Sequence, residues 1–413
     1  MPTLIPMHKL FASLVLSLLA LVAAAPAHAA YPPPVKVGDQ GFNPRAFADS
    51  SGGGTVVWTT SAGLEAVRFA ADLAAGPTVA LTTSGSNVPV AAGTGAGDVY
   101  AADREDLADD DSQIVISHLA PDGSVDTNSI NDPTTVDNDP EVATGRTGGP
   151  VLAWDAVTND FRQPKVHLAR LSPSGAVESE IELGNGFLPK PAVDDGGNVG
   201  VGWPSGNRIL VTTVTASNQI AKPAAVQRAD RERLTAVAWG KAPQPIALIE
   251  KPYKELRVVR FGNGRPKSRP IASATLVKNS TVAVDGKGAA WIAWTQRTGR
   301  GVAIRTRRMS PTGKLGPALT LSQPGTEVGA PQLAAGRNGA SVAWWSDGEK
   351  KGQSIRVAEL TPRDKAPAPK TVFSTTVTSI HTLSIAIDSE GRNLVSWYQQ
   401  GGGVGGVYLS REG

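Results

Sequence analysis

Aspartate residues gather in one short stretch of the sequence, residues 103–113 (DREDLADDDSQ). The carboxylates of Asp106, Asp109, Asp110 and Asp111 could together ligate a hard cation, because Ca²⁺ takes six to eight oxygen ligands. The stretch lacks the Asp-x-Asp-x-Asp-Gly spacing of a dedicated calcium loop, so a solvated acidic loop is the simpler interpretation. We therefore predict no cofactor, with Ca²⁺ at the Asp106–Asp111 loop as the alternative.

Basic side chains stand in two irregular segments of the second half of the chain, TQRTGRG and SDGEKKGQ. Irregular loops on a rigid scaffold are the usual place for binding, so both charged regions are candidate ligand sites. No group of residues forms a local catalytic motif, and the three histidines after residue 30 are not paired at metal-ligand spacing. The candidate binding residues are Arg104, Asp106, Asp109, Asp110, Asp111, Arg297, Arg300, Lys350, Lys351 and Tyr398.

A second set of aspartates recurs at a fixed spacing. In VAVDGKGAAWIAW (residues 282–294), a Gly follows the Asp by three residues and a Trp follows it by nine. A single Asp could be a metal ligand or an acid catalyst, but Asp also accepts backbone N–H bonds in turns where Gly supplies the positive φ. Recurrence of the spacing favours this structural role. The repeat residues are Asp49, Trp58, Trp154, Asp194, Trp203, Asp285, Trp294, Trp345, Asp388 and Trp397.

The repeat continues along the chain with a period of 45 to 52 residues. Each copy holds four short segments with β-branched residues and Gly or Pro turn signals between them. Two copies lack the Trp, because Asp103 stands in its place in the second copy and Leu248 in the fifth. Eight copies of four strands predict an all-β fold, a single β-propeller of eight four-stranded blades, with seven blades as the alternative.

The two ends of the chain predict how the ring closes. The eighth copy stops after its third strand, so its blade lacks one strand. Residues 35–38 precede the first copy in the same way that a fourth strand precedes each later copy. We therefore expect this N-terminal strand to complete the last blade, which would remove the sheet edge that an open array exposes.

The repeat resembles two propeller families, the Asp-box sialidase group and the NHL-type repeat. VDGKGAAW is similar to the Asp box Ser/Thr-x-Asp-x-Gly-x-x-Trp, except that Gly288 and Trp291 each lie one residue farther from Asp285. The Asp-x-x-Gly spacing is closer to the NHL style. The resemblance covers the chain after the first thirty residues as architecture, and a propeller fold by itself implies no activity.

The sialidase resemblance raises one enzymatic alternative. It implies a cluster of arginines around a substrate carboxylate, a tyrosine nucleophile with a glutamate partner, and an acid/base aspartate. Of the five tyrosines, only Tyr253 and Tyr398 fall in predicted face loops, and arginine is plentiful only in the second half. We therefore predict a non-enzymatic binding module, with a sialidase-like glycoside hydrolase acting at the central pit as the alternative.

Residues 1–30 have the pattern of a cleaved secretory signal peptide, which leaves residues 31–413 as the propeller domain. One cation, Lys9, precedes an apolar run that ends before Pro26, and small residues precede the predicted cleavage site. The chain has no Cys and therefore no disulfide or thiolate chemistry. We expect a secreted location, extracellular or in the cell envelope, and no membrane insertion of the mature chain.

Charge is divided unevenly along the chain, with −15 in residues 31–206 and +17 in residues 207–413. Opposite charges on the two halves of a ring favour partners of matching polarity. The cationic residues are not interleaved with aromatics, as a groove for single-stranded nucleic acid requires. The expected partner is therefore an extracellular glycan or protein rather than a nucleic acid.

Overall fold

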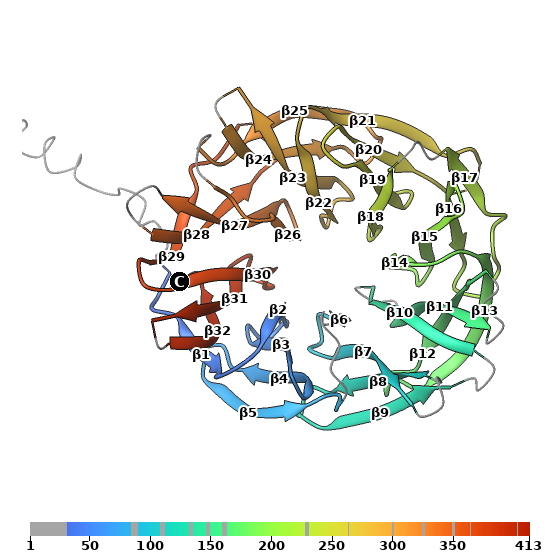
Figure 1. Ribbon diagram of the computed structural model, residues 1–413, viewed down its shortest axis with the longest axis horizontal. Coiled ribbons are helices and arrows are strands. Elements are labelled where there is room, and N and C mark those ends of the chain that lie inside the picture. Colours follow the sequence, from blue (N-terminus) through green and yellow to red (C-terminus); the bar gives the residue numbers. More distant parts are fainter. Residues whose placement is uncertain are drawn as a thin grey trace, which may run out of the picture.

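The computed structural model describes residues 31–83, 90–107, 112–131, 135–145, 149–158, 163–227, 231–262, 264–299, 301–323, 327–348, 352–363, 365–402 and 404–413. Within these ranges the chain forms 32 β-strands and no helix. The strands make eight antiparallel four-stranded sheets, which stand side by side around a common axis (Figure 1). The predicted eight-bladed propeller is confirmed, and the seven-bladed alternative is wrong.

The first four blades follow one another in chain order, each from an inner strand near the axis to an outer strand. Blade 1 contains β2 (Phe42–Ala48), β3 (Gly54–Thr60), β4 (Gly63–Phe69) and β5 (Ala75–Ala80). Blade 2 contains β6 (Val90–Gly93), β7 (Val99–Asp106), β8 (Ser112–Leu119) and β9 (Val125–Ile130). Blade 3 contains β10 (Thr135–Ala143), β11 (Val151–Thr158), β12 (Lys165–Leu171) and β13 (Val177–Asn185). Blade 4 contains β14 (Lys190–Val193), β15 (Val199–Ser205), β16 (Arg208–Val214) and β17 (Ala224–Gln227).

The remaining blades complete the ring. Blade 5 contains β18 (Arg233–Ala238), β19 (Ile246–Lys251), β20 (Glu255–Arg260) and β21 (Lys267–Ser273). Blade 6 contains β22 (Val277–Val284), β23 (Ala290–Thr298), β24 (Gly301–Met309) and β25 (Leu315–Thr320). Blade 7 contains β26 (Gln332–Ala335), β27 (Ala340–Gly348), β28 (Gly352–Leu360) and β29 (Lys370–Thr375). Blade 8 contains β30 (Ser379–Ile387), β31 (Asn393–Gly401), β32 (Val404–Arg411) and the N-terminal strand β1 (Val35–Gly38).

The N-terminal strand closes the ring as the sequence predicts. Strand β1 pairs antiparallel with β32, with Val35 opposite Leu409 and Lys36 opposite Tyr408. The carbonyl of Pro32, just before β1, accepts a hydrogen bond from the hydroxyl of Ser410 at 3.1 Å. Backbone hydrogen bonds therefore join the two ends of the chain within one sheet, and the last blade needs no other partner for its third strand.

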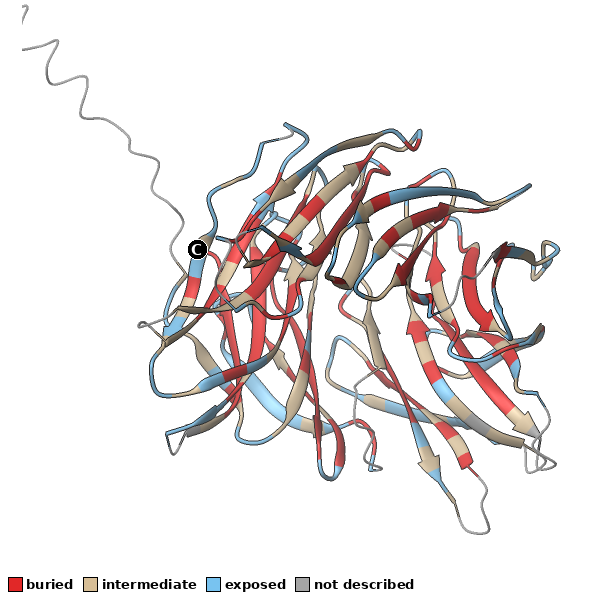
Figure 2. Ribbon diagram, turned by 45° about the horizontal axis from the view of Figure 1, so that its top comes forward, coloured by how far each residue is buried: buried red, intermediate tan, exposed pale blue. Residues whose placement is uncertain are grey.

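The hydrophobic core lies in the seams between adjacent blades. Most repeat tryptophans face the preceding blade: Trp58 packs with Leu394 and Val407 of blade 8, and Trp294 packs with Ile246 and Leu248 of blade 5. Buried positions run along the strands, whereas turns and parts of the outer strands are exposed (Figure 2). The tryptophans that are almost completely buried include Trp58, Trp154, Trp203, Trp294 and Trp397.

Blade 7 differs from the others in its tryptophan. The predicted repeat residue Trp345 is only half-buried, although it packs on the cluster between blades 7 and 8. Its neighbour Trp344 is buried and faces the preceding blade, where it packs with Trp291 of blade 6. Trp344 therefore takes the repeat position in blade 7, and the prediction of Trp345 is wrong by one residue.

In blade 5, Leu248 is fully buried but faces blade 6, where it packs with Trp294. The next residue of β19, Ile249, faces the preceding blade 4 and takes the tryptophan position, so the predicted register of the fifth copy is wrong by one residue.

Arginines at the ends of third strands join neighbouring blades. Arg170 at the end of β12 donates to the carbonyls of Gly197 (2.9 Å) and Thr215 (2.7 Å), both in turns of blade 4. Arg68 at the end of β4 makes the corresponding bond to the carbonyl of Gly97 in blade 2 at 2.6 Å. Hydrogen bonds from a charged donor are stronger than neutral ones, so these contacts add directional links to the apolar seams.

Candidate functional site

The order of strands places the loops of each blade on two faces of the ring. Turns between first and second strands, and between third and fourth strands, lie on one face, which we call the turn face. Hairpins between second and third strands lie on the opposite face with the linkers between blades, and we call this the linker face. The charged segments proposed as binding loops belong to the linker face.

The repeat aspartates lie on the turn face and hold its turns. Asp285 Oδ1 accepts the backbone N–H groups of Lys287 (2.9 Å) and Ala289 (3.0 Å), and Gly288 between them has a φ of 79°. The same pair of backbone bonds, to the residues two and four positions later, is made by Asp49, Asp194 and Asp388. This geometry gives each carboxylate a structural role and explains the repeated Asp-x-x-Gly spacing without a ligand.

The candidate binding residues that the structure describes do not converge. On blade 2, Arg104 lies 2.6 Å from the carboxylate of Asp106 and donates to Asn138 of blade 3 at 2.5 Å. Arg297 is exposed on blade 6, and Tyr398 lies on blade 8. The other predicted positions fall outside the described residues: Asp109, Asp110, Asp111, Arg300, Lys350 and Lys351.

Blade 2 departs from the repeat at the position that faces blade 1. Asp103 on β7 takes the tryptophan position and is 1% exposed. Its Oδ2 accepts a hydrogen bond from the hydroxyl of Thr82 at 3.1 Å, and that hydroxyl accepts the backbone N–H of Leu64 at 3.0 Å. The seam between blades 1 and 2 therefore contains a buried carboxylate and a hydroxyl where most other seams contain an indole ring.

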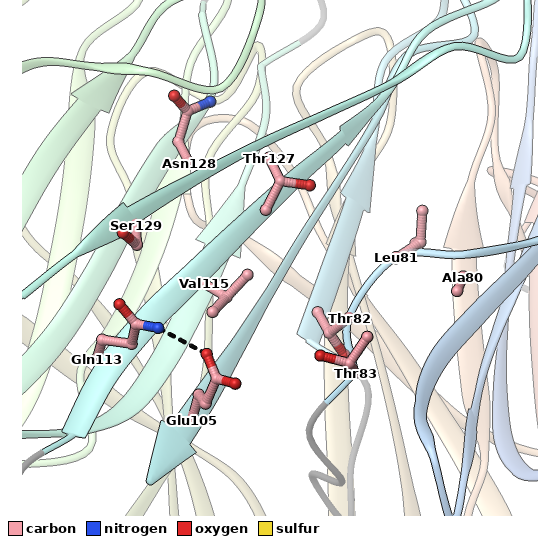
Figure 3. Close-up of a pocket in the computed structure, with 10 residues that line it drawn as sticks. All are labelled: Ala80, Leu81, Thr82, Thr83, Glu105, Gln113, Val115, Thr127, Asn128 and Ser129. Carbon is pink, nitrogen blue, oxygen red and sulfur yellow. Dashed lines mark hydrogen bonds between the residues drawn. The ribbon is translucent and has the colours of Figure 1, made fainter. Parts of the chain in front are cut away.

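A cleft opens in this same seam, with a volume of about 480 Å³ (Figure 3). Its walls come from the end of β5 and the segment after it in blade 1, and from β7, β8 and β9 in blade 2. Figure 3 shows the side chains of Glu105 and Gln113 side by side, joined by a hydrogen bond of 2.6 Å. The lining residues are Ala80, Leu81, Thr82, Thr83, Glu105, Gln113, Val115, Thr127, Asn128 and Ser129.

Strand register explains why these polar groups share one wall. Asp103 lies opposite Val115, Glu105 lies opposite Gln113, and Val115 lies opposite Ser129 on the next strand. Directly opposed residues in antiparallel strands point to the same face of the sheet, so all five side chains face blade 1. An indole at position 103 would fill part of this space, and the small side chains around it leave the space open.

The sequence pattern partly indicates this cleft. The second copy is irregular at Asp103, and the predicted binding residues Arg104 and Asp106 flank Glu105, which pairs with Gln113 across the hairpin. The pattern did not identify Thr82 or Ser129, because they come from other strands and reach the seam only through the fold. The polar lining as a whole was therefore beyond sequence reasoning.

A second cleft of about 330 Å³ lies on the turn face between blades 3 and 4. It is lined in part by Arg170, Glu178 and Asp195. The guanidinium of Arg170 is already held by Asn218 and by two carbonyls of blade 4. This cleft is therefore built around a contact between blades, and it is the weaker candidate.

The described residues offer neither a metal-binding group nor a membrane-spanning helix. Among the described residues, no three His, Asp or Glu side chains are grouped so that they could hold a metal ion. The Ca²⁺ prediction concerns a loop that is mostly outside those residues, so it stays a prediction. In the same part of the chain, no helix has the length and apolarity needed to cross a bilayer.

Comparison with known proteins identifies the architecture and no family. Neither a protein-family model nor a curated protein matches this chain. The propeller of Dos1 is similar in structure, with a TM-score of 0.52 and 11% identity over 90% of this chain and 95% of that one. At this identity the likeness shows the fold alone.

Other propellers match more loosely. The β-propeller domain of the Trilobed protease from Pyrococcus furiosus is 8% identical, with a TM-score of 0.47 over 79% of this chain and 94% of that one. The polysaccharide lyase Uly1 is 8% identical, with a TM-score of 0.46 over 76% of this chain and 88% of that one. The functions of such distant propellers differ among themselves, so the chain is similar to them as a β-propeller and in nothing more specific.

Proposed function

We propose that this chain is a secreted, non-enzymatic binding protein whose cleft between blades 1 and 2 holds a carbohydrate. One observation carries the proposal: the cleft lies in the seam where Asp103 replaces the tryptophan of the repeat. A seam that served packing alone would favour the indole, because a buried carboxylate costs free energy unless it is well hydrogen-bonded. Replacing the indole by an acid makes sense where an open, polar space is useful.

The lining suits a ligand rich in hydroxyl groups. Threonine and serine hydroxyls both donate and accept hydrogen bonds, the amides of Gln113 and Asn128 do the same, and Glu105 accepts. The volume of about 480 Å³ falls within the roughly 300–1,000 Å³ of small-molecule sites. Because the described lining residues include a carboxylate and no cationic side chain, we expect neutral or amino sugars to bind in preference to acidic ones.

The sialidase-like alternative has less support. The ring of Tyr398 stacks on His381, with ring centroids 5.5 Å apart, and among the described residues no glutamate forms a hydrogen bond with its hydroxyl. Blade 7 separates its blade from Arg297 of blade 6, which the same hypothesis would need nearby. Turnover of a chromogenic sialoside by the purified protein would overturn the proposal of a binding function alone.

The cleft can be tested by filling it. We expect the wild-type protein to bind members of an array of neutral and amino-sugar oligosaccharides, and Val115→Phe to bind them at least about tenfold more weakly because the larger ring occupies the cleft. Val177→Phe, the same change at an exposed position of blade 3, is the matched control and should bind as the wild type does.

A second variant restores the repeat. Asp103→Trp places the indole of the other blades in this seam, so we expect loss of binding with a melting temperature equal to or above that of the wild type. Equal binding by the wild type, Val115→Phe and Asp103→Trp would show that the ligand lies elsewhere. An array on which the wild type binds nothing would contradict the carbohydrate proposal itself.

A further inference from the structure

Three charged side chains occupy equivalent places on the inner strands of blades 1, 3 and 4. Arg45 lies on β2, Glu141 on β10 and Lys190 on β14, each directly after a proline. In all three cases the cross-strand partner is the residue that precedes the repeat tryptophan. The three side chains therefore start at the same depth along the axis of the ring, on strands that Figure 1 places nearest that axis.

The charges at this level are not balanced. Lys190 forms an ion pair with Glu141 across the seam between blades 3 and 4, and each side chain remains 30% exposed. Arg45 is exposed, and in the described part of the chain nothing accepts a hydrogen bond from its guanidinium or forms an ion pair with it. Asp139, the other acidic side chain that influences Lys190, is also exposed. Lys190 thus has an ion-pair partner, and Arg45 has none among the described residues.

The charge of Arg45 also acts on Lys190. Although water reaches the guanidinium, the surrounding inner strands desolvate it and lower the pKa of Arg45. Burial also lowers the pKa of Lys190, the positive charge of Arg45 lowers it further, and Asp139 acts in the opposite direction. Two like charges that interact in a poorly solvated place would both be stabilised by an anion between them.

We propose that Arg45 and Lys190 together bind an oxyanion, the carboxylate, sulfate or phosphate group of a ligand, at the inner wall of the ring. Arg45 supplies a planar fork of N–H donors that matches such groups, and Lys190 supplies a compact positive charge. Glu141 competes with the ligand for Lys190, so it weakens binding at rest. This site is separate from the cleft between blades 1 and 2, which neither cation lines.

The test measures anion binding by titration calorimetry, with inorganic sulfate, inorganic phosphate and a glucuronate oligosaccharide as probes. We expect Arg45→Gln and Lys190→Gln to weaken binding about tenfold each, as loss of a charged hydrogen bond does. Glu141→Gln should strengthen binding, because it frees the ammonium of Lys190. Arg297→Gln removes an exposed cation from the linker face of blade 6 and should change nothing.

The possible outcomes distinguish between two sources of the anion, and they also show when the proposal fails. Tighter binding of the oligosaccharide than of the inorganic ions assigns the site to an acidic sugar, and the reverse order assigns it to a free anion. Thermal melting checks that each variant is folded. The proposal is overturned if wild-type protein binds none of the three probes, if Arg45→Gln binds as the wild type does, or if Glu141→Gln weakens binding.

Discussion

At the scale of single residues, two aspartates of this repeat protein have different roles. Asp285 is 2% exposed, and its two oxygens accept two backbone N–H groups and the indole N–H of Trp291, the last at 3.0 Å. Both of its oxygens are therefore engaged within the hairpin. Asp103 instead stands where the repeat has an indole, and it accepts a hydrogen bond from Thr82, which lines the cleft. The surroundings, and not the residue type, decide which one belongs to a site.

The turn bonds predict an order of stability losses. Asp285→Ala should lower the free energy of unfolding by about 3 kcal/mol, because it leaves a buried indole N–H and two backbone N–H groups without acceptors. Asp49→Ala should cost about 1 kcal/mol, because its turn is more exposed and water can replace the carboxylate. Urea denaturation measures both values. Equal losses in the two variants would show that burial of the turn is not what matters.

At the scale of elements, the seam between blades 7 and 8 combines polar and apolar contacts near both chain ends. Lys370 Nζ forms ion pairs with Glu359 and Glu412, and Asn393 Nδ2 donates to Glu412 Oε2 at 2.7 Å. Burial alone would raise the pKa of Glu412, but hydrogen bonds and the charge of Lys370 hold it below its ordinary value. This glutamate, next to the end of β32, is therefore stabilised in its ionised form.

That shift predicts a dependence on pH. A carboxylate with a lowered pKa in the folded state contributes stability that is complete above its unfolded pKa, about 4.3, and is lost as the pH falls through the folded pKa. Glu412→Gln should therefore melt at a lower temperature than the wild type at pH 7. The difference should shrink as the pH falls below about 4. Thermal melts at several pH values measure it, and a difference that grows on acidification would contradict this account.

The strands were predictable because a similar sequence pattern recurs in eight copies. The Asp-x-x-Gly turns, the tryptophan nine residues on and the alternation of apolar residues together determine four strands per copy, and counting strands reveals that residues 35–38 must complete the last blade. The fifth copy was predicted one residue out of register, because without a tryptophan the sequence does not distinguish Leu248, which faces blade 6, from Ile249, which faces blade 4. Local pattern was sufficient wherever neighbouring residues interact with one another.

The candidate sites were less predictable because they are assembled from separate blades. The cleft is lined by Thr82, which follows β5 of blade 1, and by Ser129 on β9 of blade 2. Arg45 and Lys190 are 145 positions apart in the sequence and become related only when the inner strands surround one axis. Charged residues in the loops were predicted instead, because the loops are where a break in the repeat is visible in the sequence.

At the scale of the whole molecule, closure of the ring turns eight similar sheets into one unit. Each sheet buries its faces against two neighbours, and the seam clusters extend around the ring. The charge division of the sequence puts acidic blades 1 to 4 opposite basic blades 5 to 8 (Figure 1). Such a ring has an electrical asymmetry in its plane, so a charged ligand approaching it would be oriented before contact.

Closure itself gives the last prediction. A protein that begins at Asp39 lacks β1, which leaves β32 as an unpaired edge and removes Val37 from the cluster that surrounds Trp58. Because blades 8 and 1 share that seam, we expect the whole ring to melt in one transition at a temperature lower by about 5 °C or more.

Lys36→Ala is the matched control for this truncation. It removes only an exposed ion pair with Asp39, which is 2.7 Å away, and should leave the melting temperature within about 1 °C of the wild type. A synthetic peptide of residues 31–38, added in excess, should raise the melting temperature of the truncated protein, because it can pair again with β32. An unchanged melting temperature after truncation would mean that side-chain packing between blades 1 and 8 is enough to hold the ring closed.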